Sequence, residues 1–292
     1  MFAMHRLKAT CVLATGLALS ALLAACGSGS TFEPLAPTRV VSFGDGLSDL
    51  GQTGSKFTVN DGSVNIWVER VANSYGKTIK AQVAGGLGFA QGGARVNTGA
   101  NSMADQITSF LAGNTIGTSD LLIIDAGVAE LVALAAANPT DPALATAAEA
   151  AGKALGAQVV RLTAASGKHI VIANAPDLGK TPFATAQGRS VGLTAASRAF
   201  NDGLKVALAN VTAGVLLVDN EAYINIIYNS PTTLGAGGNV TTAACPGVAT
   251  SCTAANAVSN YGVYLYADDR HLTPRAHQLL GDNAYNKIKA RW

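Results

Sequence analysis

The chain of 292 residues has little charge: 13% of its residues are Asp, Glu, Lys or Arg, whereas 49% are apolar. This composition excludes a disordered polymer, a collagen-like repeat and a highly charged nucleic-acid tail. There is no basic surplus either, because Lys and Arg number 20 against 18 for Asp and Glu, and Arg6 and Lys8 lie in a segment that we expect to be removed. A mature chain with equal charges offers no footprint for a phosphate backbone, so we expect no nucleic-acid partner.

Nucleotide and metal motifs are also missing. Neither G-x-x-x-x-G-K-[ST] nor G-x-G-x-x-G follows an apolar run. Outside the N-terminal segment the histidines are His169, His271 and His277, and they lack the clustered carboxylates of a metal site. We interpret His169 as an ordinary exposed residue and His277 as a packing or capping residue of the last helix. No metal and no cofactor are predicted.

The first 26 residues have the pattern of an export signal. Basic residues precede an apolar stretch over residues 9–25, and Leu23-Ala24-Ala25 places small residues directly before Cys26. The stretch is shorter than the roughly 20 residues of a membrane-spanning helix, and a Gly-Ser-Gly-Ser run follows it. We therefore predict a signal peptide over residues 1–25, and hence an exported protein.

The end of this signal resembles a bacterial lipobox. The resemblance implies cleavage before Cys26, acylation of its thiol, and a lipid anchor that tethers the protein to the cell envelope. The glycine that follows Cys26 implies sorting to the outer membrane. An ordinary signal peptide with a chance cysteine at its end is the alternative. Residues 26–38 are expected to form a flexible tether, and residues 39–292 a single domain of undetermined oligomeric state.

Cysteine is scarce, and its placement is informative. Cys11 leaves with the signal and Cys26 carries the lipid, so that Cys245 and Cys252 remain, seven residues apart among small residues. In an oxidising compartment, and with no histidine beside them, this spacing predicts a local disulfide. It would staple residues 230–260, which show no hydrophobic period and are expected to form a long loop.

Short apolar runs alternate with helix-length segments in the rest of the chain. Runs bounded by Gly, Asp or Asn, as buried parallel strands are, cover residues 39–43, 120–125, 168–173 and 214–219. Helices are expected at residues 65–74, 103–111, 129–137, 142–164, 191–210 and 273–289. This order predicts an α/β fold, a three-layer, doubly wound and mostly parallel sheet in one domain.

Four segments near the ends of these runs carry candidate chemistry, because ligands of open α/β sheets bind beyond the carboxyl ends of the strands. Two are glycine-rich turns with exposed backbone N–H groups. In the last segment Asp268 precedes His271 by three residues, so its carboxylate can fix the tautomer of the imidazole. The four segments are residues 42–51, 88–96, 126–130 and 268–271.

Together these segments resemble the GDSL, or SGNH, family of ester hydrolases. The motifs occur in the family's order and span residues 39–280: Phe43-Gly44-Asp45, Gly92-Gly93, Asn174 to Pro182, Phe200-Asn201, and Asp268 with His271. The resemblance implies the flavodoxin-like SGNH fold and an esterase- or lipase-like hydrolase of carboxylic esters. It also implies a small acyl ester or an acetylated glycan as ligand.

The resemblance assigns roles to five positions, two of which have lost their side-chain chemistry. The family's nucleophilic serine follows the Gly-Asp of the first motif, and here this position is Gly46. His271 matches the base, Asp268 its orienting carboxylate, and the backbone N–H groups of Gly46 and Gly93 match two oxyanion donors. The third donor should be an asparagine, but Ala129 occupies its position.

These departures make ordinary serine catalysis doubtful. Loss of the nucleophile costs on the order of 10⁶ in kcat, and loss of one oxyanion donor costs about 10²–10³. Ser48 is an alternative nucleophile, although its place on the turn favours a capping role, and a water activated by His271 is another. Two hypotheses remain: an ester hydrolase with reduced or altered catalysis, and a degenerate member that binds an ester, a glycan or an envelope partner without turnover.

Overall fold

The computed structural model describes residues 33–63, 66–138, 140–211 and 213–292. The predicted signal peptide and Cys26 lie outside these residues. By packing, the chain divides into one unit of Met1–Leu35 with Trp292, and a second unit of Ala36–Arg291. In the first unit, the Leu35 backbone N–H donates to the Trp292 carbonyl over 2.9 Å. No helix among the described residues combines the length and the apolar character needed to cross a bilayer.

The second unit begins inside the segment predicted as a tether. Pro37 is buried, and the Thr38 N–H donates to the Ser119 carbonyl over 3.0 Å. The chain is therefore already part of the folded unit before the first strand begins, which proline and threonine content did not indicate.

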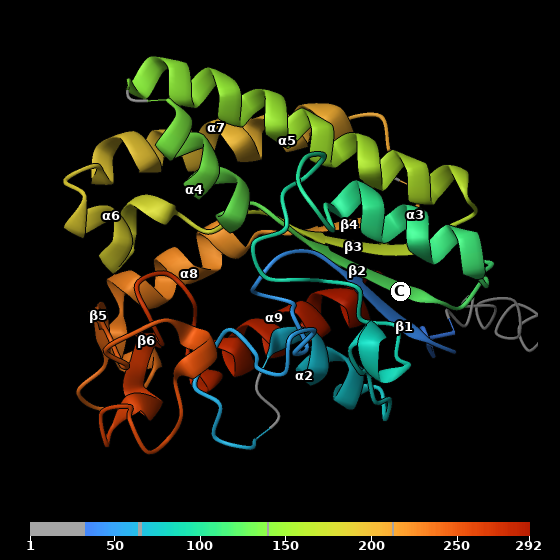
Figure 1. The fold of residues 1–292 in the computed structure, drawn as a ribbon. Coiled ribbons are helices and arrows are strands. Elements are labelled where there is room, and N and C mark those ends of the chain that lie inside the picture. Colours follow the sequence, from blue (N-terminus) through green and yellow to red (C-terminus); the bar gives the residue numbers. More distant parts are fainter. Residues whose placement is uncertain (1–32, 64–65, 139, 212) are drawn as a thin grey trace, which may run out of the picture. The chain divides into compact units, whose positions relative to one another are not determined.

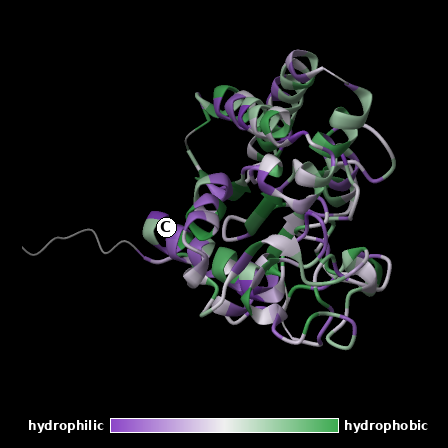
Figure 2. Cartoon of the chain, turned by 90° about the vertical axis from the view of Figure 1, so that its left-hand side faces the viewer, coloured by the Kyte–Doolittle hydropathy of each residue, from purple (hydrophilic) through white to green (hydrophobic). Residues whose placement is uncertain are grey.

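A parallel sheet of four strands forms the centre of this unit. Its strands lie side by side in chain order: β1 (Val40–Phe43), β2 (Leu121–Asp125), β3 (His169–Ala173) and β4 (Val215–Val218). Every residue of β1 and β2 is buried, as their unbroken apolar sequence predicts for strands covered on both faces. Figure 2 shows the strands as a hydrophobic centre among helices of mixed hydropathy. His169, predicted to be exposed, is half-buried at the start of β3.

A short extended segment pairs with the free edge of β1. The Ser42 N–H donates to the Leu87 carbonyl over 3.1 Å, and the Phe89 N–H donates to the Ser42 carbonyl over 2.7 Å. The chain thus leaves β1 toward one side of the sheet and then crosses to the other side to form β2. This reversal is the switch point of a doubly wound sheet, and it lies at β1.

Helices cover both faces of the sheet (Figure 1). On one face α2 (Trp67–Ser74) packs against α9 (Pro274–Arg291), and on the other lie α3 (Met103–Gly113) and α5 (Asp141–Ala164), with α7 (Ser190–Leu208) packed on α5. The remaining α-helices are α4 (Val128–Ala137), α6 (Pro182–Ala186) and α8 (Asn220–Asn229). The three layers and the parallel sheet confirm the predicted fold class.

The structure adds elements where the sequence shows no period. Residues 230–260, predicted as a loop, contain the strand β5 (Asn239–Ala243), which pairs in parallel with β6 (Tyr264–Tyr266) just after this segment. Cys245 and Cys252 form the predicted disulfide. Single-turn 3₁₀ helices complete the fold: η1 (Gln82–Ala84), η2 (Leu178–Lys180), η3 (Pro231–Thr233), η4 (Ala249–Ser251) and η5 (Tyr261–Val263).

Candidate active site

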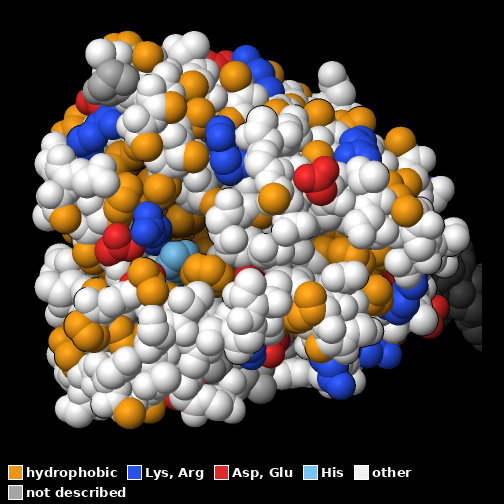
Figure 3. Space-filling model, viewed as in Figure 1, with side chains coloured by type: hydrophobic (Ala, Val, Ile, Leu, Met, Phe, Trp, Pro, Cys, Tyr) orange, Lys and Arg blue, Asp and Glu red, His pale blue; other side chains and the backbone are white. Residues whose placement is uncertain are grey.

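A pocket of about 350 Å³ opens at the carboxyl ends of β1 and β2. Asp45 and Gly46 reach it from the turn after β1, Gly93 from the turn after the edge segment, Ala129 from the first turn of α4, and His271 from the turn between β6 and α9. Figure 3 shows a hollow on this face, with a histidine side chain inside it and hydrophobic and basic side chains around it. The structure thus gathers residues from four distant parts of the sequence.

Asp268 and His271 form a hydrogen-bonded pair on one turn. The Nδ1 atom of His271 lies 2.8 Å from Asp268 Oδ2 and 3.0 Å from Oδ1, and the backbone N–H groups of Arg270 and His271 donate to Oδ1 over 3.0 and 2.7 Å. Burial alone would raise the pKa of the Asp268 carboxyl, but the hydrogen bonds and the imidazole's charge hold it well below its ordinary value. An ionised carboxylate only accepts, so Nδ1 carries a proton and Nε2 can receive one.

The Nε2 atom of this imidazole faces Gly46. A Cβ atom built on Gly46 would lie 2.9 Å from His271 Nε2 and 3.2 Å from Cγ of Phe57. A side chain at position 46 would therefore stand within reach of the base, as an activated nucleophile must. The Phe57 ring packs against the imidazole, with 4.9 Å between ring centroids. Because residue 46 is glycine, no side chain separates its backbone from the imidazole of His271.

The backbone N–H groups of Gly46 and Gly93 line the same pocket. Neither has a hydrogen-bond partner among the residues that the structure describes, so both can donate to a ligand oxygen. Gly93 adopts φ +80°, a left-handed conformation that glycine takes without strain. The two residues whose N–H groups the resemblance assigns as oxyanion donors thus line the same pocket as His271.

Two buried carboxylates hold these turns in place. Asp45 accepts from the N–H groups of Leu47 (3.2 Å), Gly127 (3.3 Å) and Ala129 (3.1 Å). Asp49 accepts from the N–H groups of Gly51 (2.8 Å), Gln52 (2.9 Å) and, in the next glycine-rich turn, Gly92 (2.7 Å). These bonds join the turn after β1 to the turns that bear Ala129 and Gly93. The backbone of the oxyanion region is therefore fixed by side chains, whatever residue occupies position 46.

Ala129 and Glu130 lie in the first turn of α4 and have different roles. Ala129 lines the pocket but brings no side-chain donor, and its own N–H is occupied by Asp45. Glu130, where the family resemblance expects aspartate, accepts from Arg95 Nε (3.0 Å) and Nη2 (2.6 Å) and from the Val96 N–H (2.9 Å). The glutamate thus ties α4 to the segment after Gly93 and makes a structural contact.

Ser48 does not reach the pocket. It is fully buried, and its Oγ accepts from Trp67 Nε1 over 3.0 Å. The same indole nitrogen lies 3.3 Å from Asp125 Oδ2. Ser48 therefore packs under the turn, caps none of the described helices, and is not among the residues that line the pocket. The structure does not bring it to the imidazole.

Asp125 forms a buried acidic pair with Asp45. Burial raises the pKa of Asp45, and burial together with the charge of Asp45 raises the pKa of Asp125 well above its ordinary value. The Asp125 carboxyl is thus disposed to be neutral, in contrast to Asp268, whose pKa is lowered.

Sequence reasoning missed the apolar wall of the pocket. Val128, Val132 and Ala136 follow at intervals of four along α4 and line the cavity. That spacing could have identified one apolar face of the helix, but the same spacing occurs whether such a face packs on the sheet or lines a cavity. Phe57 lies in a loop without a period and could not have been found from the pattern.

Two arginines on the pocket wall were missed as well. Arg95 is held by Glu130, and Arg270 lies beside His271 with its Nε 3.0 Å from Asp269 Oδ1. The Arg270 guanidinium also stands over the Phe183 ring, 4.8 Å from its centroid. The one sequence feature that could have identified Arg270 as a pocket residue is that it directly precedes His271. Both side chains give the apolar pocket a basic rim.

The sequence matches the family model of GDSL-like lipases and acylhydrolases over residues 40–284, so the chain belongs to this family. No curated protein matches it. It is similar to the solved structure of a lipolytic G-D-S-L family member from Veillonella parvula, at 12% identity over 85% of this chain and 96% of that one, with a TM-score of 0.48. It is also similar to Est24, a carbohydrate acetylesterase from Sinorhizobium meliloti, at 16% identity over 87% and 99%, with a TM-score of 0.49.

Proposed function

We propose that this protein binds small carboxylic esters above Gly46 and hydrolyses them slowly, with a water molecule in place of the serine hydroxyl. One observation carries the proposal: His271 Nε2 lies 2.9 Å from the Cβ position of Gly46, while Asp268 holds the opposite ring nitrogen. A water in the space of the missing side chain would contact a base that is already oriented.

The reaction needs no covalent intermediate. The water gives a proton to Nε2 as its oxygen attacks the carbonyl carbon of the ester. The N–H groups of Gly46 and Gly93 donate to the oxygen that becomes negative. As the intermediate collapses, the ester C–O bond breaks and the proton on Nε2 passes to the departing alcohol, which leaves an acid and an alcohol. Turnover is expected to be orders of magnitude below that of a serine enzyme.

The pocket favours an ester with a short apolar acyl group. Its α4 wall offers Val128, Val132 and Ala136, and Phe57 closes the side next to the imidazole. Apolar walls gain free energy from burying hydrocarbon, while Arg95 and Arg270 at the rim suit a polar or anionic alcohol portion, such as an acetylated glycan. An acyl or acetyl ester matches both features.

Binding without turnover is the second candidate, and Ala129 favours it. The pocket offers two backbone donors to an oxyanion but no side-chain donor at this position. A site with neither hydroxyl nor third donor can still bind an ester or a glycan by its apolar wall and basic rim.

Turnover of a short-chain p-nitrophenyl ester separates the two candidates. We expect the wild-type protein to exceed the buffer rate, and both His271→Ala and Gly46→Ala to fall to that rate. The first variant removes the base, and the second puts a methyl group in the space of the water, 2.9 Å from Nε2. If wild type and His271→Ala are equal at background, hydrolysis is refuted and the binding function stands.

We also propose export and a lipid anchor on Cys26. The Cys245–Cys252 disulfide supports an oxidising compartment outside the cytosol. When the gene is expressed in a bacterium fed radiolabelled palmitate, the protein should carry label and sediment with outer membranes. Cys26→Ala should lose the label and become soluble after export, and label on Cys26→Ala would contradict the proposal.

A further inference from the structure

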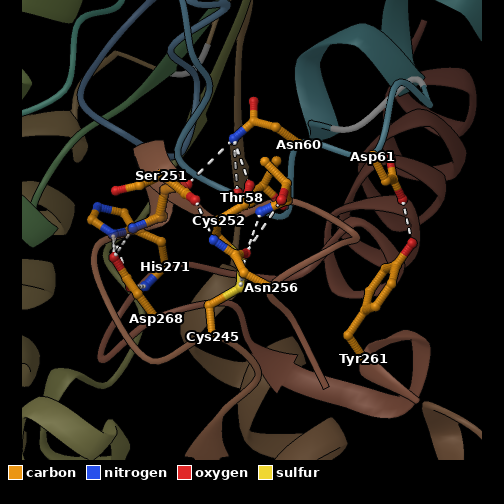
Figure 4. The surroundings of a disulfide bond; sticks show 12 residues. Thr58, Asn60, Asp61, Cys245, Ser251, Cys252, Asn256, Tyr261, Asp268 and His271 are labelled. Atoms are coloured by element: carbon orange, nitrogen blue, oxygen red, sulfur yellow. Dashed lines mark hydrogen bonds and ion pairs between the residues drawn. A yellow bond between two sulfur atoms is a disulfide. The ribbon is translucent and has the colours of Figure 1, made fainter. Parts of the chain in front are cut away.

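The disulfide closes a loop that lies next to the Asp268–His271 pair (Figure 4). The Cys245 N–H donates to the Ala267 carbonyl over 2.8 Å, which anchors the start of the loop to the residue before Asp268. Cys245 and Cys252 are buried in one small cluster with Val59 and Ala267. The loop is thus packed against the turn that carries the acid and the base.

One backbone group of this loop contacts the carboxylate itself. The N–H of Ala249, the first residue of η4, donates to Asp268 Oδ2 over 2.9 Å, and both groups are buried. The same oxygen lies 2.8 Å from His271 Nδ1. Oδ1, in contrast, receives N–H groups from Asp268's own turn, at Arg270 and His271. Among the described residues, Ala249 is the donor to this carboxylate that comes from a separate segment.

The loop also contacts the segment that carries Phe57. The Asn60 N–H donates to the Cys252 carbonyl over 2.8 Å, and the Asn60 amide donates to the carbonyls of Cys252 (3.2 Å) and Ala249 (3.3 Å). Asn60 lies three residues after Phe57, whose ring packs on His271. The loop therefore braces both the carboxylate below the imidazole and the ring beside it.

The side chains of the loop cannot order it by themselves. The six residues between the cysteines are Pro, Gly, Val, Ala, Thr and Ser, and Val248, the largest apolar one, is 60% exposed. Little apolar area is buried to offset the entropy of fixing this backbone. The disulfide lowers the conformational entropy of the unfolded loop, so that less free energy from packing is needed to order it.

We propose that the loop closed by Cys245 and Cys252 is a positioning element of the site, and that Ala249 is a positioning residue which holds the Asp268 carboxylate on Nδ1 of His271. The inference rests on the proposed role of His271 as a base. If the proposal holds, the strength of the hydrogen bond between Asp268 and His271 depends on a disulfide that joins two cysteines seven residues apart. Neither cysteine lines the pocket.

Two variants separate the N–H group from the cross-link. Ala249→Pro deletes the single donor and leaves the disulfide; proline suits the first position of a helical turn, and Val248 before it has φ −72° and ψ 146°, which a following proline requires. Cys245→Ser with Cys252→Ser deletes the cross-link and keeps the donor. Val248→Pro is the matched control, because its N–H has no partner among the described residues and its φ already suits proline.

The readout is the Nδ1 proton of His271 in NMR spectra of histidine-¹⁵N-labelled protein, assigned by its loss in His271→Gln. A proton held on a buried carboxylate exchanges slowly and resonates far downfield. We expect this signal in wild type and in Val248→Pro, and its loss or upfield shift in Ala249→Pro and in the double cysteine variant. A signal unchanged in either of these two variants overturns the proposal.

Folding and function are controlled separately. Near-UV circular dichroism shows whether each variant keeps its tertiary structure, and if the double cysteine variant unfolds, Ala249→Pro with its intact disulfide decides. The NMR signal needs no turnover, so it tests the positioning role even if the wild-type protein hydrolyses no ester. In a Gly46→Ser background, Ala249→Pro should lower kcat about tenfold or more and leave KM unchanged, since the acyl wall is untouched.

Discussion

The turn of Asp268 and His271 carries the carboxylate and the imidazole that a general base needs, whereas the turns after β1 and β2 bring backbone N–H groups to the pocket but no hydroxyl at position 46 and no amide at position 129. On the first side, three backbone N–H groups and one imidazole converge on a buried carboxylate. On the second, Asp45 and Asp49 still hold the turns of Gly46 and Gly93, although positions 46 and 129 carry no hydroxyl and no amide.

The contrast shows which parts of such a site depend on which residues. The turns of Gly46 and Gly93 are held by the carboxylates of Asp45 and Asp49, so the position of their N–H groups does not depend on the side chain at position 46. The hydroxyl and the third donor are single side chains, and each can be lost without disturbing the turn that bore it. Substitutions that restore or remove single side chains therefore test the comparison directly.

The largest expected effect is a gain of activity in Gly46→Ser. A hydroxyl added at the Cβ position faces Nε2 of His271 and restores a covalent route, which is worth on the order of 10⁶ in kcat in an intact triad. We expect a smaller gain, about 10³-fold, because the imidazole and Phe57 must move by a few tenths of an ångström to admit Cβ. Steady-state kinetics on a p-nitrophenyl ester measure it; a rate no higher than that of Gly46→Ala would show that the acid–base side is not usable.

The next effect is expected from Ala129→Asn in the Gly46→Ser background. A side-chain amide at the start of α4 would supply the third oxyanion donor, which is worth about 10²–10³ in kcat. The gain should appear in kcat with little change in KM, since the donor acts on the developing charge. Ala133→Asn, one helical turn further along the pocket wall, is the control and should give no gain.

The smallest expected effect is on the pH dependence of the free energy of unfolding. Its sign is opposite for His277, in the helix that follows His271, and for Asp125, at the end of β2. His277 in α9 is fully buried with neither ring nitrogen paired among the described residues, and burial lowers its pKa to about 3. The unfolded chain binds this proton below pH about 6.5 and the folded chain does not, so the free energy of unfolding falls by up to about 1.4 kcal/mol per pH unit toward pH 3.

Urea unfolding at pH 7 and pH 5 tests this sign. His277→Leu should lose less stability on acidification than wild type. Asp125→Asn should lose more, because a carboxyl whose pKa is raised in the folded state stabilises it as the pH falls. Equal losses in all three proteins would contradict the contrast between the two sides.

The fold could be predicted because its strands are buried on both faces. Continuous apolar runs such as residues 121–124 mark central parallel strands, and the structure places all four predicted strands within a residue or two. The pairing of β5 with β6 could not be predicted. Asn239–Ala243 is largely polar and only Val240 is buried, so its sequence has neither the apolar content nor the alternation of a strand.

The site could be predicted where short motifs carry it. Asp268 and His271 are three residues apart, and the glycine turns follow strands, so their convergence follows from the topology of a doubly wound sheet. Phe57 and Ala249 could not be found this way. Their contacts with His271 and Asp268 depend on how two loops fold back, and one of them uses a backbone N–H that every residue except proline has.

Covalent trapping tests the central claim most directly, namely that the base is in place and the hydroxyl is missing. Wild type, Gly46→Ser and Gly46→Ser with His271→Ala are incubated with a fluorophosphonate, and the intact mass of each is measured. One adduct on Gly46→Ser, located at position 46 by peptide mapping, and none on the other two is the predicted result. An adduct on wild type, at Ser48 or elsewhere, or none on Gly46→Ser, would contradict the account.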